Sequence, residues 1–292
     1  MPLFPGDRLG LSSACHPGLT LDEAAQRGHE LGFRTFEMLA FDGYRHSQGI
    51  LRGFYFEHMT ARERDDLRAI ADRFDHVSTH APFIDMTPLA PNPSVRETAV
   101  RQLEIAIEAV AFLGGTTTTT HVAPRSTWTY EDSLGDLTDL YRRLGDLAGQ
   151  RAVTVTLETG WPGDVRAFAD LVHGIDHPAV GANVDVGHLV GTIPPDLRGT
   201  EEGMVLYNDR LEEHVRSLEG RLFHFHLHDV RREDFRDHRA AGRGFLDYPR
   251  LMATAAEIGY EGLFVFELEE PDFDQALRDS KLCIERAMGL AD

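Results

Sequence analysis

Short apolar runs rich in β-branched residues alternate with longer amphipathic segments along the whole chain, and this alternation restricts the fold more than any other feature. Such runs predict buried strands, whereas apolar residues at helical spacing predict helices that cover them. Eight strand and helix units are present. The expected strands cover residues 8–14, 33–39, 76–80, 116–121, 153–158, 180–185, 222–228 and 263–268, and the expected helices cover 21–31, 61–74, 94–113, 131–148, 165–175, 201–218, 248–258 and 274–288.

Repeated strand, helix, strand order requires parallel pairing, because each helix carries the chain back to the edge where the previous strand began. Eight units in 292 residues predict an α/β fold, a closed (β/α)₈ TIM barrel, built as a single domain from residues 1–292. An open doubly wound sheet is the competing architecture. It is disfavoured because residues 11–17 (LSSACHP), after the first expected strand, contain no glycine-rich phosphate loop.

Composition excludes several classes of protein. A hydrophobic content of 42% with 26% charged residues is typical of a soluble globular protein. No apolar run approaches the roughly 18 residues of a membrane helix, and the start of the chain has neither the basic nor the apolar region of a secretory signal. We therefore expect a cytoplasmic protein without a membrane partner. Cys15 and Cys283 are far apart and lack partners at zinc-ligand spacing, which disfavours a disulfide framework and a cysteine zinc site.

The net charge of −19 bears on the kind of partner. Binding to nucleic acid depends on Lys and Arg side chains that neutralise phosphates, so this acidic excess argues against a nucleic-acid partner. We interpret the excess as a solvated surface that does not identify a substrate.

Acidic or imidazole side chains stand at the ends of four successive expected strands. In a closed barrel, the C-terminal ends of the strands and the loops after them form the active site. The four strand-end residues are Glu158, Asp185, His226 and Glu267. These strand ends surround the open end of the barrel, here called its mouth. Further polar residues are expected there, namely Glu37, His80, His121, His188 and His238.

This set of residue types predicts a divalent-metal site. Imidazoles and carboxylates without thiolates suit Mn²⁺, Zn²⁺, Co²⁺, Mg²⁺ or Fe²⁺. Several carboxylates buried together are costly unless a cation compensates their charge. The alternative for His80 or His121 taken alone is a hydrogen-bonded core histidine.

Three histidines alternate along one expected strand and should therefore face the same side of the barrel wall. Of these, His226 should lie at the height of the metal, with His224 deeper and His228 nearer the mouth. Two long connections stand out, residues 40–59 and 186–202. The first is rich in aromatic and histidine residues, so we interpret it as a lid or pocket wall, with a simple surface insertion as the alternative.

Segments near the expected strand ends resemble a known family. They are STHAPF (78–83), LETGWPG (157–163), NVDVGHL (183–189), HFHLHDV (224–230), HRAAGRGFLDY (238–248) and GYEGLFVFELE (259–269). In order and spacing they are similar to the xylose-isomerase-like TIM barrels. That superfamily contains sugar isomerases and epimerases of the tagatose 3-epimerase type and the endonuclease IV-type nucleases. The resemblance covers nearly the whole chain.

The epimerase pattern within this resemblance implies one divalent metal ion with four ligands: Glu158, Asp185, His226 and Glu267. A ketose or related keto-polyol would be the substrate. Glu158 and Glu267 would be the catalytic residues, one taking a proton from one face of the substrate and the other returning it on the opposite face through an enediolate.

The same pattern implies residues for substrate binding. His188 and Arg232 would bind substrate oxygens, with Arg231 an equally placed alternative to Arg232. His80 and Trp161 are further candidates for contact with the substrate. The resemblance also allows a homo-oligomer. It names neither the sugar nor its phosphorylation state.

The nuclease pattern is an alternative that implies several zinc ions. Its possible additional metal ligands here are His80, His121, His188 and His238, beside the four strand-end residues. The ninth ligand of that pattern, an aspartate, falls on Arg236, with Asp237 adjacent. A cation in place of a carboxylate should weaken a third metal. We therefore favour an isomerase or epimerase over a nuclease.

Two further alternatives remain open. A dehydratase on the same scaffold would abstract a proton with the same metal site and then expel hydroxide, so it shares the first half of the mechanism. A metal-stabilised binding protein without turnover would leave the paired Glu158 and Glu267 unexplained.

Overall fold

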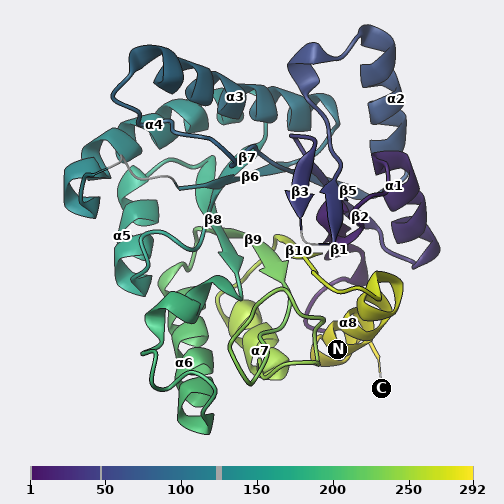
Figure 1. Ribbon diagram of the computed structural model, residues 1–292, viewed down its shortest axis with the longest axis vertical. Coiled ribbons are helices and arrows are strands. Elements are labelled where there is room, and N and C mark those ends of the chain that lie inside the picture. Colours follow the sequence, from purple (N-terminus) through teal and green to yellow (C-terminus); the bar gives the residue numbers. More distant parts are fainter. Residues whose placement is uncertain (1, 47, 123–126, 292) are drawn as a thin grey trace.

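Eight parallel strands close into a barrel in the computed structural model, which describes residues 2–46, 48–122 and 127–291 (Figure 1). The strands follow one another around the barrel in the order β1, β2, β5, β6, β7, β8, β9 and β10, and β10 pairs with β1. The predicted (β/α)₈ barrel is confirmed, and the open sheet is excluded. The strands are β1 (Leu9–Ser12), β2 (Thr35–Leu39), β5 (His76–His80), β6 (Thr117–His121), β7 (Thr154–Glu158), β8 (Val180–Asp185), β9 (Leu222–Leu227) and β10 (Leu263–Phe266).

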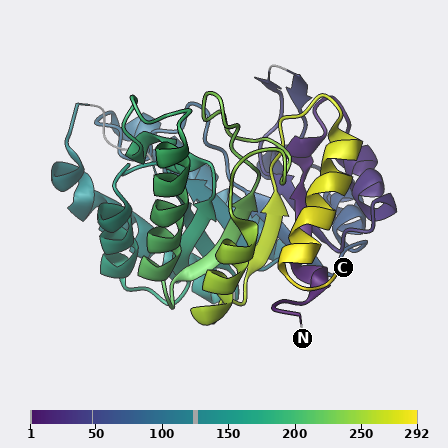
Figure 2. The same cartoon turned by 90° about the horizontal axis from the view of Figure 1, so that it is seen from below.

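The helices form a ring outside the barrel, and the strands point toward the loops drawn uppermost in Figure 2. Three of the helices begin with a threonine capping box, in which the Thr side chain accepts from a backbone N–H that would otherwise lack a partner. The helices are α1 (Leu21–Glu30), α2 (Ala61–Ala71), α3 (Pro93–Phe112), α4 (Tyr130–Gln150), α5 (Val165–Ile175), α6 (Glu201–Ser217), α7 (Tyr248–Glu257) and α8 (Phe273–Ala287). Among the described residues, no helix is long and apolar enough to cross a membrane.

Three strands end earlier than the sequence predicts, and the expected strand 222–228 does so by a single residue. The expected strand 8–14 ends at Ser12, because a 3₁₀ turn, η2 (Ser13–Cys15), follows. The expected strand 263–268 ends at Phe266, although the Glu267 N–H still donates to the Leu227 carbonyl at 3.2 Å. That bond anchors the backbone of Glu267 to the neighbouring strand.

Alternate residues of the strands divide the barrel wall into two faces. The outer face is largely apolar, as where Phe36 stacks on Phe74 with ring centroids 4.9 Å apart. Inside the barrel, hydroxyl groups pair with one another, as in the 3.1 Å contact of Thr119 with Thr156. The interiors of such barrels are usually filled by branched apolar residues. Here a polar interior lies directly below the predicted site.

Candidate metal centre and active site

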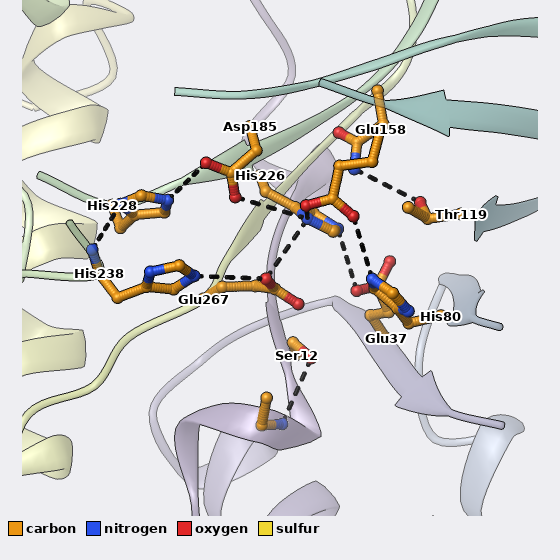
Figure 3. Close-up of polar contacts among 12 residues, drawn as sticks. Ser12, Glu37, His80, Thr119, Glu158, Asp185, His226, His228, His238 and Glu267 are labelled. Carbon is orange, nitrogen blue, oxygen red and sulfur yellow. Dashed lines mark hydrogen bonds and ion pairs between the residues drawn. The ribbon is translucent and has the colours of Figure 1, made fainter. Parts of the chain in front are cut away.

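The four predicted ligands come together at the C-terminal ends of four neighbouring strands (Figure 3). Glu158 and Asp185 are the last residues of β7 and β8, His226 is on β9, and Glu267 directly follows β10. One ligand atom of each residue lies within 4.8 Å of the corresponding atoms of the other three. The Nδ1 atom of His226 is at the centre, 3.5 Å from Glu158 Oε1, 3.9 Å from Asp185 Oδ2 and 3.4 Å from Glu267 Oε2.

The charges of this cluster suit a divalent cation. Asp185 and His226 are fully buried, and Glu158 is 3% exposed. Asp185 Oδ2 and His226 Nδ1 have no hydrogen-bond partner among the described residues, although both point into the cluster. Buried polar atoms are rarely left without a partner. Three carboxylates and one imidazole are a donor set that a divalent ion would satisfy.

The carboxylate of Glu158 is held in its ionised form. Burial opposes the ionisation of Glu158, yet the adjacent His121 and His226 hold the pKa of its carboxyl well below the ordinary value. Burial also opposes protonation of His226, but the charges of Glu267, Glu37 and Glu158 raise the pKa of this imidazole well above 6.5. Opposite charges at short distance favour the charged form of both partners.

Histidines surround the carboxylate of Glu158. Its Oε2 atom lies 3.0 Å from His80 Nε2 and 2.9 Å from His121 Nε2. Its Oε1 atom lies 3.4 Å from His188 Nδ1. The ligand atoms of Glu158, His80 and His121 are close enough to form a second group that could hold a metal. On the opposite side, His238 Nε2 lies 3.9 Å from Glu267 Oε2.

Glu37 lies deeper than the sequence predicts. It is fully buried inside the barrel, below His226, and does not line the mouth. Its Oε1 atom lies 3.2 Å from His226 Nε2, and its Oε2 atom accepts from the Ser78 hydroxyl at 2.9 Å and lies 3.1 Å from His224 Nε2. The deep position predicted for His224 is confirmed. A Glu at the fifth position of the expected strand 33–39 was the only sequence signal for this contact.

A cavity of about 230 Å³ opens above the metal cluster. The connection 40–59 forms one wall of it through Phe41, Tyr44 and Leu51, so this connection is a pocket wall. Phe83 completes the aromatic side and stacks on His121, with ring centroids 4.4 Å apart. Among the described residues that line this cavity there are carboxylates and histidines but no Arg or Lys.

A second cavity of about 360 Å³ adjoins the first and shares His121, Glu158 and His188 with it. Trp161 lines this second cavity and not the first. Its ring meets Tyr130 edge-on, with centroids 5.6 Å apart. The predicted substrate contacts are therefore divided between two adjacent spaces, with His188 bordering both.

The predicted arginines lie away from the cavities. Arg232 lines neither of them, and its Nη1 atom lies 3.6 Å from Met204 Sδ. Arg231 forms an ion pair with Asp234 instead. The loop after β9 directs both side chains outward.

Arg236 stands at the position of the ninth ligand of the nuclease pattern, as the sequence predicts. Arg236 pairs with Glu269 at 3.3 Å. Asp237, however, reaches the site without a loop shift, because it lines the second cavity and lies 3.1 Å from His238 Nδ1. A carboxylate is therefore present at the mouth even though Arg236 stands at the expected position.

The chain belongs to the xylose isomerase-like TIM barrel family, whose model matches residues 25–286. An uncharacterized protein of Methanocaldococcus jannaschii, MJ1311, is 23% identical over 226 residues, covering 74% of this chain and 72% of that protein.

Solved structures share the fold. A D-tagatose 3-epimerase-like protein matches with 20% identity and a TM-score of 0.73, covering 96% of this chain and 97% of that one. The 3-keto-D-glucoside 4-epimerase YcjR of E. coli matches with 19% identity and a TM-score of 0.70, covering 96% and 99%. The IolI protein with a bound zinc atom matches with 16% identity and a TM-score of 0.71, covering 96% and 98%.

Proposed function

We propose that this protein is a divalent-metal-dependent sugar isomerase or epimerase acting on a ketose or related keto-polyol. The observation that carries the proposal is the placement of two glutamates, Glu158 and Glu267, within 3.5 Å of His226 Nδ1 at the floor of a small cavity. The structural similarity to sugar epimerases, one named for tagatose and one for a 3-keto-glucoside, supports it.

The cluster would hold one divalent ion through Glu158, Asp185, His226 and Glu267. When bound, the ion would supply Lewis acidity that makes a C–H bond beside the substrate carbonyl easier to ionise. Mn²⁺, Zn²⁺, Co²⁺, Mg²⁺ and Fe²⁺ all suit this donor set. The structurally similar IolI protein has a bound zinc atom, which supports metal binding by a protein of this fold.

The two glutamates would move the proton. Glu158, kept ionised by its histidine neighbours, would take a proton from one face of the substrate, and Glu267 would return a proton to the other face of the enediolate, or the reverse. His188 borders both cavities and would donate a hydrogen bond to a substrate oxygen. His80 lines the first cavity, but the Ala81 carbonyl and Glu158 already engage its two ring nitrogens, so it would contact the substrate through its ring. Trp161 would contact the part of a substrate that extends into the second cavity.

The size and charge of the mouth favour a small molecule. A cavity of about 230 Å³ accommodates a sugar or polyol but not a duplex. The described side chains that line it provide no Arg or Lys to neutralise phosphates, which binding to nucleic acid requires.

One observation favours a second candidate, a multi-zinc phosphodiesterase. The cluster of His80, His121 and Glu158 could hold a second ion, and Asp237 beside His238 offers a carboxylate for a third. That function requires about three zinc ions per chain and cleavage of DNA at abasic sites.

Hydrogen exchange tests the proposed function. We expect the metal-loaded protein, incubated in D₂O with a panel of ketoses and keto-polyols, to introduce deuterium at the carbon beside the carbonyl of at least one of them. A dehydratase would also release water, which product analysis would reveal. Absence of exchange across the panel, with about three bound zinc ions and cleavage of abasic DNA, would establish the nuclease function instead.

A further inference from the structure

His228 is a fully buried residue just after β9 that belongs to neither the proposed metal ligands nor the substrate contacts. Its Nδ1 atom accepts the backbone N–H of His238 at 2.8 Å. A neutral imidazole has one acceptor nitrogen and one N–H, so acceptance at Nδ1 places the proton on Nε2. The Nε2 atom lies 2.8 Å from Asp185 Oδ1, and His228 therefore donates a hydrogen bond to this carboxylate (Figure 3).

The carboxylate of Asp185 is oriented by three donors on one oxygen. Besides His228, the backbone N–H groups of Gly187 and His188 donate to Oδ1, at 2.9 and 3.1 Å. The other oxygen, Oδ2, has no hydrogen-bond partner among the described residues and faces His226 Nδ1 at 3.9 Å. The three bonds hold one oxygen away from the cluster and direct the other into it.

The ring of His228 has little freedom to move. It stacks on His238, with ring centroids 4.1 Å apart and an interplanar angle of 9°. A Cβ atom added at Gly187 would overlap with Cε1 of His228, so the absence of a side chain at residue 187 makes room for the ring. The carbonyl of His228 accepts from the Tyr248 hydroxyl at 2.6 Å.

Asp185, His228 and His238 also have ligand atoms close enough to surround an ion. The hydrogen bonds of His228 oppose that interpretation. One ring nitrogen has its lone pair engaged by the His238 N–H, and the other carries the proton donated to Asp185. Neither nitrogen offers a lone pair to a metal unless one of these bonds breaks.

We propose that His228 is a positioning residue that orients Asp185 toward the divalent ion and does not itself ligate metal. This inference rests on the metal centre of the proposed function, but not on the identity of the substrate. Partners that hydrogen-bond to metal ligands typically change metal affinity by 10–100-fold when they are removed.

Isothermal titration of the chelator-treated full chain with Mn²⁺ or Zn²⁺ tests the proposal. His228→Asn retains an acceptor near the His238 N–H but has no donor that reaches Asp185, and we expect its metal affinity to fall by about 10–100-fold with the saturating stoichiometry unchanged. His228→Gln places an amide N–H near the former Nε2 position, so its affinity should recover toward that of the wild type.

Tyr248→Phe is the matched control, because it removes a buried hydrogen bond to the backbone of His228 without altering the ring. Its melting temperature should fall while its metal affinity stays that of the wild type. Wild-type affinity in folded His228→Asn would overturn the positioning role, as would a fall in stoichiometry by one ion in both His228 variants. A wild-type protein that binds no ion would overturn the metal centre itself. Normal metal binding without deuterium exchange would contradict only the proposed reaction.

Discussion

At the scale of single residues, the site is governed by the compensation of buried charge. Glu158 lies within 3.5 Å of four imidazoles and beside two other carboxylates of the metal cluster. A buried carboxylate is costly without such partners. The same contacts that make the burial of Glu158 tolerable keep it ionised and ready to accept a proton.

Glu158→Gln should lower turnover of the ketose substrate by about 10²–10⁴-fold, because the amide preserves shape but cannot accept the proton. Its metal affinity should also fall, since the amide lacks the carboxylate charge. Steady-state kinetics and deuterium exchange measure the first effect, and isothermal titration measures the second. Glu269→Gln is the control, because Glu269 lines the same cavity but pairs with Arg236 outside the metal cluster. Equal turnover in the two variants would contradict the catalytic role of Glu158.

At the scale of elements, packing between helices introduces a pH dependence that is separate from the site. His214 of α6 packs against Phe168 of α5, and its ring nitrogens have no hydrogen-bond partner in the described parts of the chain. Burial lowers the pKa of His214 to about 4. In the unfolded chain the imidazole of His214 becomes protonated below pH 6.5, whereas in the folded chain it stays neutral down to about pH 4.

The contribution of His214 to stability is therefore complete above pH 6.5 and is lost as the pH falls toward 4. Between pH 6.5 and 5 the loss should reach about 2 kcal/mol. His214→Leu should remove this part of the pH dependence. Urea unfolding of both proteins at pH 7 and pH 5 measures it, and the difference between the two proteins cancels the titration of the other histidines. If the difference in unfolding free energy between the wild type and His214→Leu is the same at pH 7 and pH 5, His214 does not titrate in this way.

The secondary structure was largely predictable, because helix and strand periodicity are properties of neighbouring residues. The expected range 76–80 matches β5, and 165–175 matches α5. The ends of β1 and β10 were not predictable in the same way. The Ser12 side chain starts a turn by accepting from the Ala14 N–H. The pairing of β10 beyond Phe266 depends on its neighbour β9, which lies about 40 residues earlier in the sequence.

At the scale of the whole molecule, the barrel brings together ligands that four strands carry. Glu158 and Glu267 are more than a hundred residues apart in sequence, and only closure of the barrel brings them to the same imidazole. A bound ion should therefore link these strands and stabilise the folded chain as a whole.

Addition of Mn²⁺ or Zn²⁺ at about 100 times the dissociation constant should stabilise the folded protein by about 2.7 kcal/mol. This corresponds to a rise of several degrees in Tm. Asp185→Ala should abolish most of the rise, whereas Asp146→Ala, which alters a carboxylate that is 73% exposed, should retain it. Differential scanning calorimetry with and without the ion measures both. An equal rise in Asp185→Ala would remove Asp185 from the ligand set.

The sequence by itself determined the barrel and the set of strand-end side chains, because both follow from local periodicity and from where each apolar run stops. It also carried the family resemblance, which the match over residues 25–286 confirms. The alternation of His224, His226 and His228 was likewise enough to place all three on the inner face.

Only the tertiary structure decided how those side chains meet. Strand register places Glu37 below His226 and not at the mouth, and the loop after β9 turns Arg232 away while bringing Asp237 in. The proton position on His228 depends on a backbone N–H ten residues further along the chain. These features depend on distances between segments that are remote in sequence, and a one-dimensional pattern of residue types does not contain those distances.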